Sequence, residues 1–363
     1  MKLGLFMMPI HNHVRDYHQT LMEDIEAIVH ADRLGFSEAW VGEHHGSKSE
    51  QITSPLLFLS HVLPQTEQIV CGTGVICLPQ YHPAVTAGHI AMFDHLAKGR
   101  YIAGLGPGGL APDFELFGLM EADRNAMMVE AIDIMVDIWT SDPPYEYNGE
   151  HWRFALKDWI DEEKGLGYMA KPYQKPHPPL AISAMSPFSG SIRFAGSRGY
   201  IPISANFIGA WSVKSHWQAY AEAADKAGQA TDPEIWHVAR NIHVDETDAA
   251  AEAFVKAAED STDWYFSYLF RLFDRGGMKG PFVVNPGDDP EALRHEALRD
   301  NFTIYGSPET VAEKILALRD EVGHFGTLMQ TAQDWTDKER MKRSMTLLAE
   351  EVMPRVNAAI GAN

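Results

Sequence analysis

Short apolar stretches alternate with amphipathic stretches along almost the whole chain, and no other feature limits the possible folds as strongly. We expect about eight strands, at residues 2–8, 38–43, 69–78, 100–106, 179–183, 201–205, 235–244 and 326–332. Between them apolar residues recur at helical spacing, as where Leu21, Ile25 and Ile28 share one face before Gly35. Repeated strand–helix units of this kind predict a parallel sheet with helices packed outside it.

The number of units selects among the parallel-sheet folds. Eight strand–helix units without a linker favour a closed (β/α)8 barrel of the α/β class over an open doubly wound sheet. We predict one such domain over residues 1–363, with its active site at the carboxyl ends of the strands. Two less regular stretches, about 140–178 and 261–300, are long enough to be functional loop insertions, and we place both at that face.

Charge and composition exclude several classes of partner. Acidic residues outnumber basic ones by 50 to 30, for a net charge of −20, and no run of Lys or Arg is present. Nucleic acids and anionic membrane surfaces are therefore not expected partners, because both require a basic face. No apolar stretch has the length of a membrane span, and the apolar N-terminus is too short for a signal peptide. We expect a cytoplasmic protein.

The two cysteines agree with a reducing compartment. Cys71 and Cys77 fall in one predicted strand, roughly 20 Å apart along it. That distance is too long for a disulfide bond. We therefore expect both to be small buried apolar residues.

The second predicted strand ends in Glu43, His44 and His45, where a barrel active site draws its residues. His44 suits general acid–base catalysis, since the pKa of imidazole lies near neutrality. A metal site needs three or four converging ligands, which this tripeptide alone does not supply, so we predict no metal site. The alternative is that one histidine forms a local hydrogen bond and the other is exposed.

Glycines gather near the ends of the next two strands. Gly72 and Gly74 lie within the third strand, where glycine marks either the close approach of a ligand or a β-bulge. Residues 104–109 match the dinucleotide-binding fingerprint literally, but Pro107 and Pro112 interrupt the helix that this fingerprint requires. We expect instead a glycine-lined loop against which a flat ring can lie.

The fifth strand leads into serines at the start of a predicted helix, Ser186, Ser189 and Ser191, with Gly190 among them. Hydroxyl and backbone N–H groups at a helix N-terminus form a phosphate site. A serine that caps the helix without a ligand is the alternative. Hydrolysis by a Ser–His–Asp triad is not supported, because the G-x-S-x-G elbow is absent from the sequence.

Taken together, the sequence resembles the bacterial luciferase-like flavin monooxygenases. The matching segments are KLGLF (2–6), GFSEAWVGEHH (35–45), GTGVICLPQYHP (72–83), HLAKGRYIAGLGPGG (95–109), DFELFG (113–118), AISAMSPFSGSIRFAG (181–196), IYGSPETVAEKI (304–315) and EEVMP (350–354). Residues 123–132 are similar to limonene monooxygenase-like members, and residues 191–204 and 216–228 to diketocamphane monooxygenase-like members.

The resemblance implies a luciferase-like barrel that takes FMN as FMNH2 from a separate flavin reductase, with O2 as co-substrate. A flavin C4a-hydroperoxide then inserts oxygen into a small apolar substrate of the terpenoid or cyclic ketone type. The alternatives are a deazaflavin-dependent dehydrogenase of the same fold, or a non-catalytic flavin-binding subunit. The resemblance also implies a homodimer formed through helices near the second and third strand–helix units, to which Met92 and Phe93 would contribute.

Site roles follow from the resemblance position by position. His44 corresponds to the catalytic histidine. Residues that correspond to the flavin site are Gly74 and Val75 (a bulge against the isoalloxazine ring, often with a cis peptide), Gly106, Gly108 and Gly109 (the loop beside the flavin), and Met185, Ser186, Ser189 and Gly190 (the phosphate turn). Pro107 stands where luciferase has an arginine on the phosphate, so the phosphate needs backbone N–H groups, serine hydroxyls and another cation, for which Arg193 is the candidate.

Aromatic residues are our candidates for the wall of the substrate pocket or a lid over it, because the oxygenating species must be shielded from water. They are Trp152, Phe207, Trp211 and Tyr265, with Trp159 and Tyr268 as further lid candidates. Each of them is equally compatible with an ordinary place in the core or at an interface.

Overall fold

The computed structural model describes residues 1–258 and 261–361, so the last two residues of the predicted domain, 362–363, lie outside it. The strands are β1 (Lys2–Met7), β2 (Glu38–Val41), β3 (Val70–Thr73), β4 (Ile76–Cys77), β5 (Tyr101–Gly106), β6 (Tyr145–Asn148), β7 (Arg153–Leu156), β8 (Leu180–Ala184), β9 (Ile201–Ser204), β10 (His237–Val244), β11 (Thr303–Gly306) and β12 (Thr327–Thr331). The helices are α1 (Tyr17–Arg33), α2 (Pro55–Val62), α3 (Pro83–Ala97), α4 (Ala111–Leu116), α5 (Arg124–Thr140), α6 (Gly190–Arg198), α7 (Ala210–Ala227), α8 (Asp248–Val255), α9 (Ser261–Arg275), α10 (His295–Phe302), α11 (Pro308–Val322), α12 (Lys338–Leu347) and α13 (Met353–Gly361).

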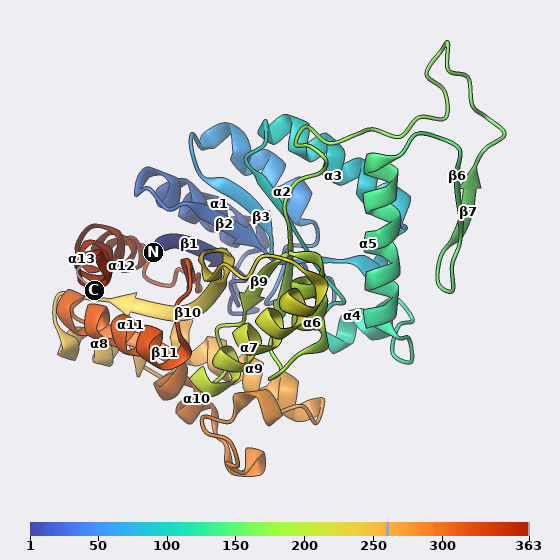
Figure 1. The fold of residues 1–363 in the computed structure, drawn as a ribbon. Coiled ribbons are helices and arrows are strands. Elements are labelled where there is room, and N and C mark those ends of the chain that lie inside the picture. Colours follow the sequence, from blue (N-terminus) through green and yellow to red (C-terminus); the bar gives the residue numbers. More distant parts are fainter. Residues whose placement is uncertain (259–260, 362–363) are drawn as a thin grey trace.

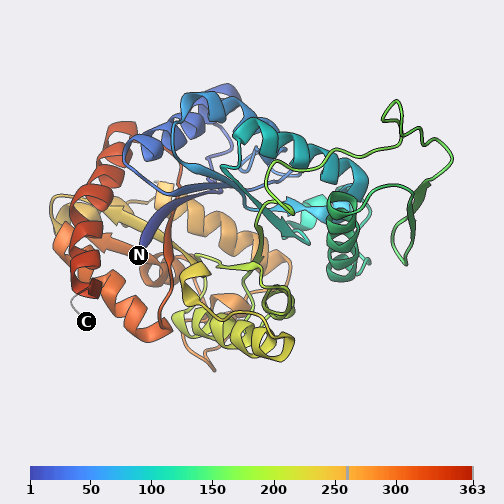
Figure 2. The ribbon, with the colours of Figure 1, turned by 45° about the horizontal axis from the view of Figure 1, so that its top comes forward.

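The parallel strands close into a barrel, as the alternation of strands and helices predicted (Figures 1 and 2). The order runs β1, β2, β3, β5, β8, β9, β10 and β12, and β12 pairs with β1 to complete the circle. β3 and β4 are two pieces of one barrel strand, since both pair with β5. The outer half of β10 leaves the barrel and pairs with β11. The closed (β/α)8 barrel and its eight predicted strands are confirmed.

Side chains fill the interior of the barrel, so it is a packed core and not a channel. An inner cluster of buried residues consists of Phe6, Trp40, Ala181, Ile203, Ala239 and Met329. Below it the Glu38 carboxylate accepts hydrogen bonds from Trp40 Nε1 at 2.8 Å and His237 Nε2 at 2.7 Å. A larger apolar cluster lies between the strands and the helices. A ligand site must therefore lie at an end of the barrel.

The second insertion, residues 261–300, is more regular than we expected. Its first part forms α9, in which Tyr265, Leu269 and Phe273 recur at helical spacing and are buried. The many aromatic residues concealed this period in the sequence. The insertion does cover the carboxyl ends of the strands, because the Tyr268 hydroxyl lies 2.8 Å from Ser47 Oγ, after β2.

The first insertion, 140–178, does not begin at the face where we placed it. It runs from the end of α5 to the start of β8, and because helices run antiparallel to the strands, both points lie at the opposite end of the barrel. It forms the antiparallel hairpin β6–β7, which projects beside α5 (Figure 1). The hairpin turn comes back along α5, where Glu130 accepts hydrogen bonds from the backbone of His151 at 3.1 Å and Trp152 at 2.8 Å.

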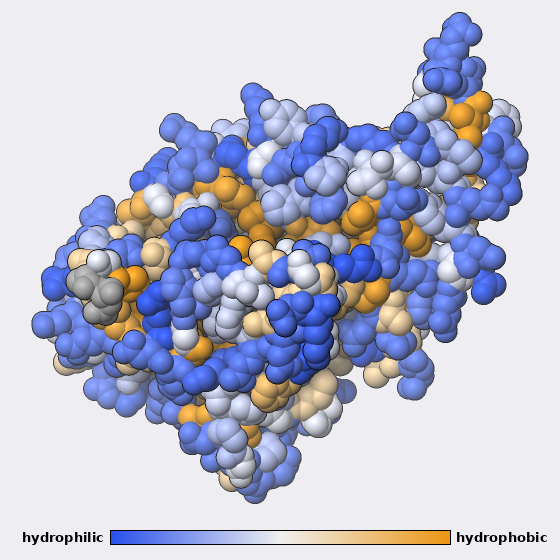
Figure 3. Space-filling view, viewed as in Figure 1, coloured by the Kyte–Doolittle hydropathy of each residue, from blue (hydrophilic) through white to orange (hydrophobic). Residues whose placement is uncertain are grey.

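The surface and the cysteines follow from the composition. Hydrophilic residues cover most of the face seen in Figure 3, in keeping with a net charge of −20. Cys71 and Cys77 are both free and buried. No helix within the described residues is long and apolar enough to cross a membrane.

Candidate active site

A cavity of about 430 Å³ opens at the carboxyl ends of the barrel strands. The segments that line it are Phe6 and Met8 at the end of β1, Glu43, His44 and Glu50 after β2, Gly74, Val75 and Cys77 around β4, 107–110 after β5, 122–125 at the start of α5, 183–186 at the end of β8 with Ser189 and Ser191, 203–207 around the end of β9, Ala239 in β10, and Leu269, Leu272 and Phe273 of α9. This is the position that the barrel fold predicts for an active site.

His44 lies between two buried carboxylates. Its Nδ1 atom is 3.3 Å from Asp113 Oδ2, on α4, and its Nε2 atom is 3.2 Å from Glu50 Oε2, in the loop after β2. Burial alone would lower the pKa of His44, but the charges of Glu50 and Asp113 outweigh that effect, and the pKa lies above its ordinary value. The two carboxylates therefore favour the protonated form of His44.

Asp113 is itself held in place by the loop that carries His44. Its carboxylate accepts hydrogen bonds from the backbone N–H groups of His45, at 3.1 Å, and Gly46, at 2.5 Å. Burial would raise the pKa of Asp113, but the hydrogen bonds from His44 and these amides lower it below its ordinary value. Asp113 is thus a fixed negative charge that orients the imidazole.

Glu43 holds the short strand β4 in place. One of its oxygens accepts a hydrogen bond from the Tyr81 hydroxyl and lies 3.2 Å from His45 Nε2. The other accepts the backbone N–H of Cys77 at 3.0 Å. Burial raises the pKa of Glu43, and these hydrogen bonds offset part of that effect. Its contacts fix β4 against the end of β2.

The barrel strand is interrupted between β3 and β4, where Gly74 and Val75 are joined by a cis peptide bond. Both residues line the cavity, so the bulge that the resemblance implied is present and faces a space large enough for a ligand. Gly106 lies behind it and does not line the cavity. A Cβ atom on Gly106 would come within 2.5 Å of Val75 Cγ2, so glycine is required there by packing. Gly108 and Gly109 do line the cavity.

The serine turn after β8 also faces the cavity. Ser186 and Ser189 line it together with Met185. Ser189 caps α6, since its hydroxyl accepts the backbone N–H of Ser191 at 3.3 Å. Gly190 lines an adjoining groove instead. The turn therefore presents hydroxyl groups and the N-terminus of α6 to one end of the cavity.

A chain of buried hydrogen bonds fastens this turn to α7. His216 Nε2 donates to the carbonyl oxygen of Ser186 at 2.9 Å, and His216 Nδ1 accepts from Ser204 Oγ at 2.9 Å. Ser204 Oγ in turn accepts from Trp236 Nε1 at 3.0 Å. Burial lowers the pKa of His216 to about 4, so the ring is neutral and its tautomer is set by these partners.

Arg193, our candidate for the cation at the phosphate, does not line the cavity. Arg193 points outward, where it forms an ion pair with Glu222 at 2.8 Å on the surface. Arg124, the first residue of α5, lines the cavity instead. Its guanidinium lies 3.8 Å from the centre of the Phe114 ring and donates to the carbonyl oxygen of Leu119 at 2.8 Å. The sequence gives no sign of this, because Arg124 and the serine turn come from different strand–helix units.

The aromatic candidates are placed in different ways. Phe207 lines the cavity. Tyr265 lies one layer behind, where its hydroxyl accepts a hydrogen bond at 2.8 Å from Asn206, a lining residue. Trp211 packs against the second insertion and donates to the Val283 carbonyl oxygen at 3.2 Å.

Two further aromatic candidates lie away from the cavity. Trp152 belongs to the hairpin turn, where its ring lies 5.9 Å from that of His82. Trp159 is 81% exposed. Both belong to the first insertion, which leaves the barrel at its other end. Leu269, Leu272 and Phe273 of α9 provide the apolar wall that these tryptophans were expected to form.

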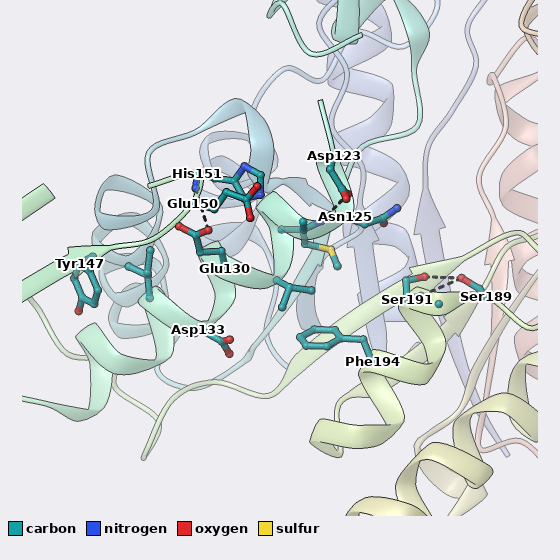
Figure 4. A pocket seen from close by; sticks show the side chains of 15 residues that line it. Asp123, Asn125, Glu130, Asp133, Tyr147, Glu150, His151, Ser189, Ser191 and Phe194 are labelled. Atoms are coloured by element: carbon teal, nitrogen blue, oxygen red, sulfur yellow. Dashed lines mark hydrogen bonds between the residues drawn. The ribbon is translucent and has the colours of Figure 1, made fainter. Parts of the chain in front are cut away.

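A wide groove of about 850 Å³ adjoins the cavity between α5, the hairpin turn and the start of α6 (Figure 4). It shares Asp123, Asn125, Ser189 and Ser191 with the cavity. Its other lining carboxylates are Glu130, Asp133 and Glu150, of which Glu130 and Glu150 lie across the groove from the serines. We call this the α5–α6 groove; it gives the serine end of the cavity an acidic neighbourhood.

Comparison with known proteins places these features in a family. A family model described as luciferase-like monooxygenase matches residues 1–324. The chain is 30% identical to 3,6-diketocamphane 1,6-monooxygenase of Pseudomonas putida, over 98% of both chains. It is 27% identical to limonene 1,2-monooxygenase of Rhodococcus erythropolis, over 99% of this chain and 87% of that one.

Two other comparisons bear on the cofactor. The chain is 26% identical to the oxygenase component of a flavin-dependent trigonelline monooxygenase of Acinetobacter baylyi, over 92% of this chain and 89% of the relative. Among solved structures, the oxygenating constituent of 3,6-diketocamphane monooxygenase from Pseudomonas putida, in complex with FMN, superposes with a TM-score of 0.88. It is 31% identical over 98% of both chains.

Proposed function

This chain belongs to the luciferase-like monooxygenase family, and from that premise we propose that it is an FMN- and O2-dependent monooxygenase acting on a small apolar molecule. The observation that carries the proposal is that the 74–75 bulge, the serine turn and His44 all line one cavity. Each of these three parts comes from a different strand end, and together they match the needs of a flavin, its phosphate and a proton transfer.

The cavity fits the parts of FMN. The bulge at Gly74 and Val75 and the loop at 108–109 offer backbone against which a flat isoalloxazine ring would lie. Ser186 and Ser189 at the start of α6 would hold the phosphate, since hydroxyl groups and helix N-termini favour anions. Arg124 would supply the positive charge that Pro107 cannot.

When bound, reduced FMN would supply oxygen activation, through the C4a-hydroperoxide that the family resemblance implies. The chain contributes the surroundings of that chemistry. His44, whose protonated form is stabilised by Asp113 and Glu50, would be the source of the proton that reaches the reacting oxygen atoms. The side chains of Glu50 and Asp113 are buried and that of His44 is only 11% exposed, which limits the exchange of this proton with water.

The apolar side of the cavity supports the substrate class. Phe207, Leu269, Leu272 and Phe273 line it, and three of them belong to α9, which lies across the strand ends. Such a wall favours a compact apolar molecule and gives little to recognise a charged one. A terpenoid or cyclic ketone, like the substrates named for two of the relatives, fits this description.

The source of electrons is a second part of the proposal. A relative is named as the oxygenase component of a flavin-dependent system, which supports a separate flavin reductase as a transient partner of this chain. Reduced FMN would reach the open mouth of the cavity by diffusion from that reductase.

The α5–α6 groove favours FMN over a deazaflavin cofactor. A deazaflavin carries a longer acidic tail beyond its phosphate, and that tail would have to pass the serine turn. The space there contains the carboxylates of Asp123, Glu130, Asp133 and Glu150. These negatively charged carboxylates would repel the acidic tail. A deazaflavin-dependent dehydrogenase is therefore a weaker candidate than an FMN-dependent monooxygenase.

A homodimer is the third part of the proposal. Val85, Met92 and Leu96 are 49%, 59% and 55% exposed on one face of α3, and Leu57 of α2 is 75% exposed beside them. An apolar stripe on two adjacent helices is typical of an interface. Phe93, which we also expected there, is buried in the core of its own chain.

The test of the proposed activity is oxygen transfer. The protein is mixed with FMN, NADH, an unrelated flavin reductase and 18O2, with limonene and a bicyclic diketone as probes. Incorporation of one 18O atom into either probe, dependent on FMN and on this protein, is the expected result. FMN reduction that yields H2O2 without any labelled product from a panel of terpenes and cyclic ketones would contradict the substrate class.

A further inference from the structure

Three buried carboxylates lie around His44, and the partners of their oxygen atoms distinguish them. Both oxygens of Glu43 are occupied, one by the Tyr81 hydroxyl and the other by the backbone of Cys77. Both oxygens of Asp113 are occupied as well, by backbone N–H groups and by His44. Every oxygen atom of these two carboxylates therefore has at least one hydrogen-bond partner within the protein.

Glu50 is different from the other two. Its Oε2 atom lies 3.2 Å from His44 Nε2, but within the described part of the chain its Oε1 atom is buried and accepts no hydrogen bond. The residue is 5% exposed and lines the cavity. A buried carboxylate oxygen without a donor is costly, so its retention beside a cavity indicates that a donor or a proton arrives there from a ligand.

His44 lines the cavity, but neither of its ring nitrogens is free to donate into it. Each of its ring nitrogens faces a carboxylate, Asp113 on one side and Glu50 on the other. A proton that leaves His44 towards the cavity therefore passes to Glu50 first. We propose that Glu50 is the residue that exchanges a proton with the reacting oxygen atom, while His44 supplies and recovers that proton. This inference rests on the proposed monooxygenase function.

The proton transfer balances without a further reactant. Before it, the His44 imidazolium is held between the Glu50 and Asp113 carboxylates. The Nε2 proton moves to Glu50 Oε2, the carboxylic acid so formed turns about its Cγ–Cδ bond, and the same proton then passes to a negatively charged oxygen in the cavity. Glu50 is then a carboxylate again, and His44 is a neutral ring whose remaining proton stays on Nδ1, hydrogen-bonded to Asp113. One proton has moved from His44 to the ligand, and no electron has moved within the protein.

Tyr268 provides the competing explanation. Its hydroxyl, on α9, lies 2.8 Å from Ser47 Oγ, and burial together with the nearby Glu50 carboxylate raises the pKa of Tyr268. In this explanation Glu50 serves only as a neighbour of Tyr268 on α9 and has no role in the cavity. The variant Tyr268→Phe separates the two roles, because it removes the hydroxyl next to Glu50 and leaves the carboxylate and His44 in place.

The first experiment uses the protein without flavin, so its result does not depend on the proposed activity. The His44 ring is titrated by NMR in the wild type, Glu50→Gln and Tyr268→Phe, with its signals assigned from His44→Gln. We expect Glu50→Gln to lower the pKa of His44 by about one unit or more, because a negative charge at 3.2 Å is removed. Tyr268→Phe should leave it unchanged. An unchanged pKa in Glu50→Gln overturns the proposed pairing.

The second experiment follows the reaction of FMN-loaded, reduced protein with O2 by stopped-flow absorbance, in H2O and in D2O. We expect Glu50→Gln to slow the decay of the oxygenated species to oxidised FMN and H2O2 about tenfold or more, and to change its solvent isotope effect. FMN affinity should stay within about twofold of the wild type, and Tyr268→Phe should react like the wild type.

Two results would overturn the role of Glu50: decay in Glu50→Gln at the wild-type rate, or equal slowing in Glu50→Gln and Tyr268→Phe. A wild type that forms no oxygenated species contradicts the proposed function instead. In that case the titration of His44 alone decides whether His44 and Glu50 share a proton.

Discussion

The imidazole of His44 and the carboxylate of Asp113 meet at 3.3 Å although 69 positions separate them in the chain. His44 follows β2, while Asp113 sits in a short helix that follows β5, and the closed barrel brings the two ends together. The contact gives the histidine a fixed orientation and a raised pKa. Several measurable consequences follow from this relationship and from the groups around it.

Asp113→Asn should lower the pKa of His44 and reduce oxygen transfer. The substitution removes one of the two negative charges that stabilise the imidazolium, while an amide oxygen can still accept the backbone N–H groups of the neighbouring loop. We expect product formation to fall roughly tenfold to a hundredfold, with its pH optimum shifted downwards. Glu115→Gln, an exposed change on the same helix, is the control and should have no effect.

Arg124→Gln should weaken the binding of FMN much more than that of riboflavin. If the guanidinium contacts the phosphate, its removal costs about 1.5–3 kcal/mol, or roughly tenfold to a hundredfold in Kd. Riboflavin has no phosphate and should bind both proteins alike. Arg193→Gln should not change either affinity, since Arg193 pairs with Glu222 on the surface. Equal losses for both flavins would show that Arg124 supports the fold and not the phosphate.

Stability should decrease as the pH falls below neutrality. Burial lowers the pKa of His216 and His243 to about 4, from an ordinary value of 6.5. Both rings are neutral in the folded protein, so the unfolded chain binds more protons between pH 6.5 and 4, and folding loses up to roughly 3 kcal/mol per group over that interval. Urea unfolding at pH 7.5, 6 and 5 measures this. In His216→Phe the dependence on pH should be shallower, and an identical slope would exclude the assigned contribution.

The apolar stripe on α3 should control the oligomeric state. Met92→Glu combined with Leu96→Glu places two charges on exposed positions, so it should leave the monomer folded but disrupt a homodimer. Light scattering coupled to gel filtration is expected to give a dimer for the wild type and a monomer for the variant. A wild-type monomer, or a variant that remains dimeric, would place the interface elsewhere or remove it.

The barrel could be predicted from the sequence because the alternation of apolar and amphipathic segments is a local pattern. His44 could be located because it follows directly after a strand. Asp113 and Arg124 could not be assigned to the site, since they lie on α4 and α5, and only the closed barrel brings these helices beside the loop after β2. Glu50 lies in the same loop as His44, but its sequence position does not show that its carboxylate meets the imidazole.

The two insertions show a similar limit. Their aromatic residues suggested that both insertions cover the site, but aromatic content does not show at which end of the barrel an insertion lies. Trp152 and Trp159 belong to a segment that starts at the far end of the barrel, whereas Leu269 and Phe273 lie on a helix that crosses the strand ends. The order of the elements would have placed the first insertion correctly. It connects the end of a helix to the start of a strand, and such a connection begins at the end of the barrel where the strands begin.

The central claim is that this cavity protects an oxygenated flavin, and one stopped-flow measurement tests it directly. The protein is loaded with reduced FMN without substrate and mixed with buffer containing O2. We expect a species with the absorbance of a C4a-hydroperoxide that persists for seconds before oxidised FMN appears. Immediate formation of oxidised FMN with a stoichiometric amount of H2O2 would contradict it.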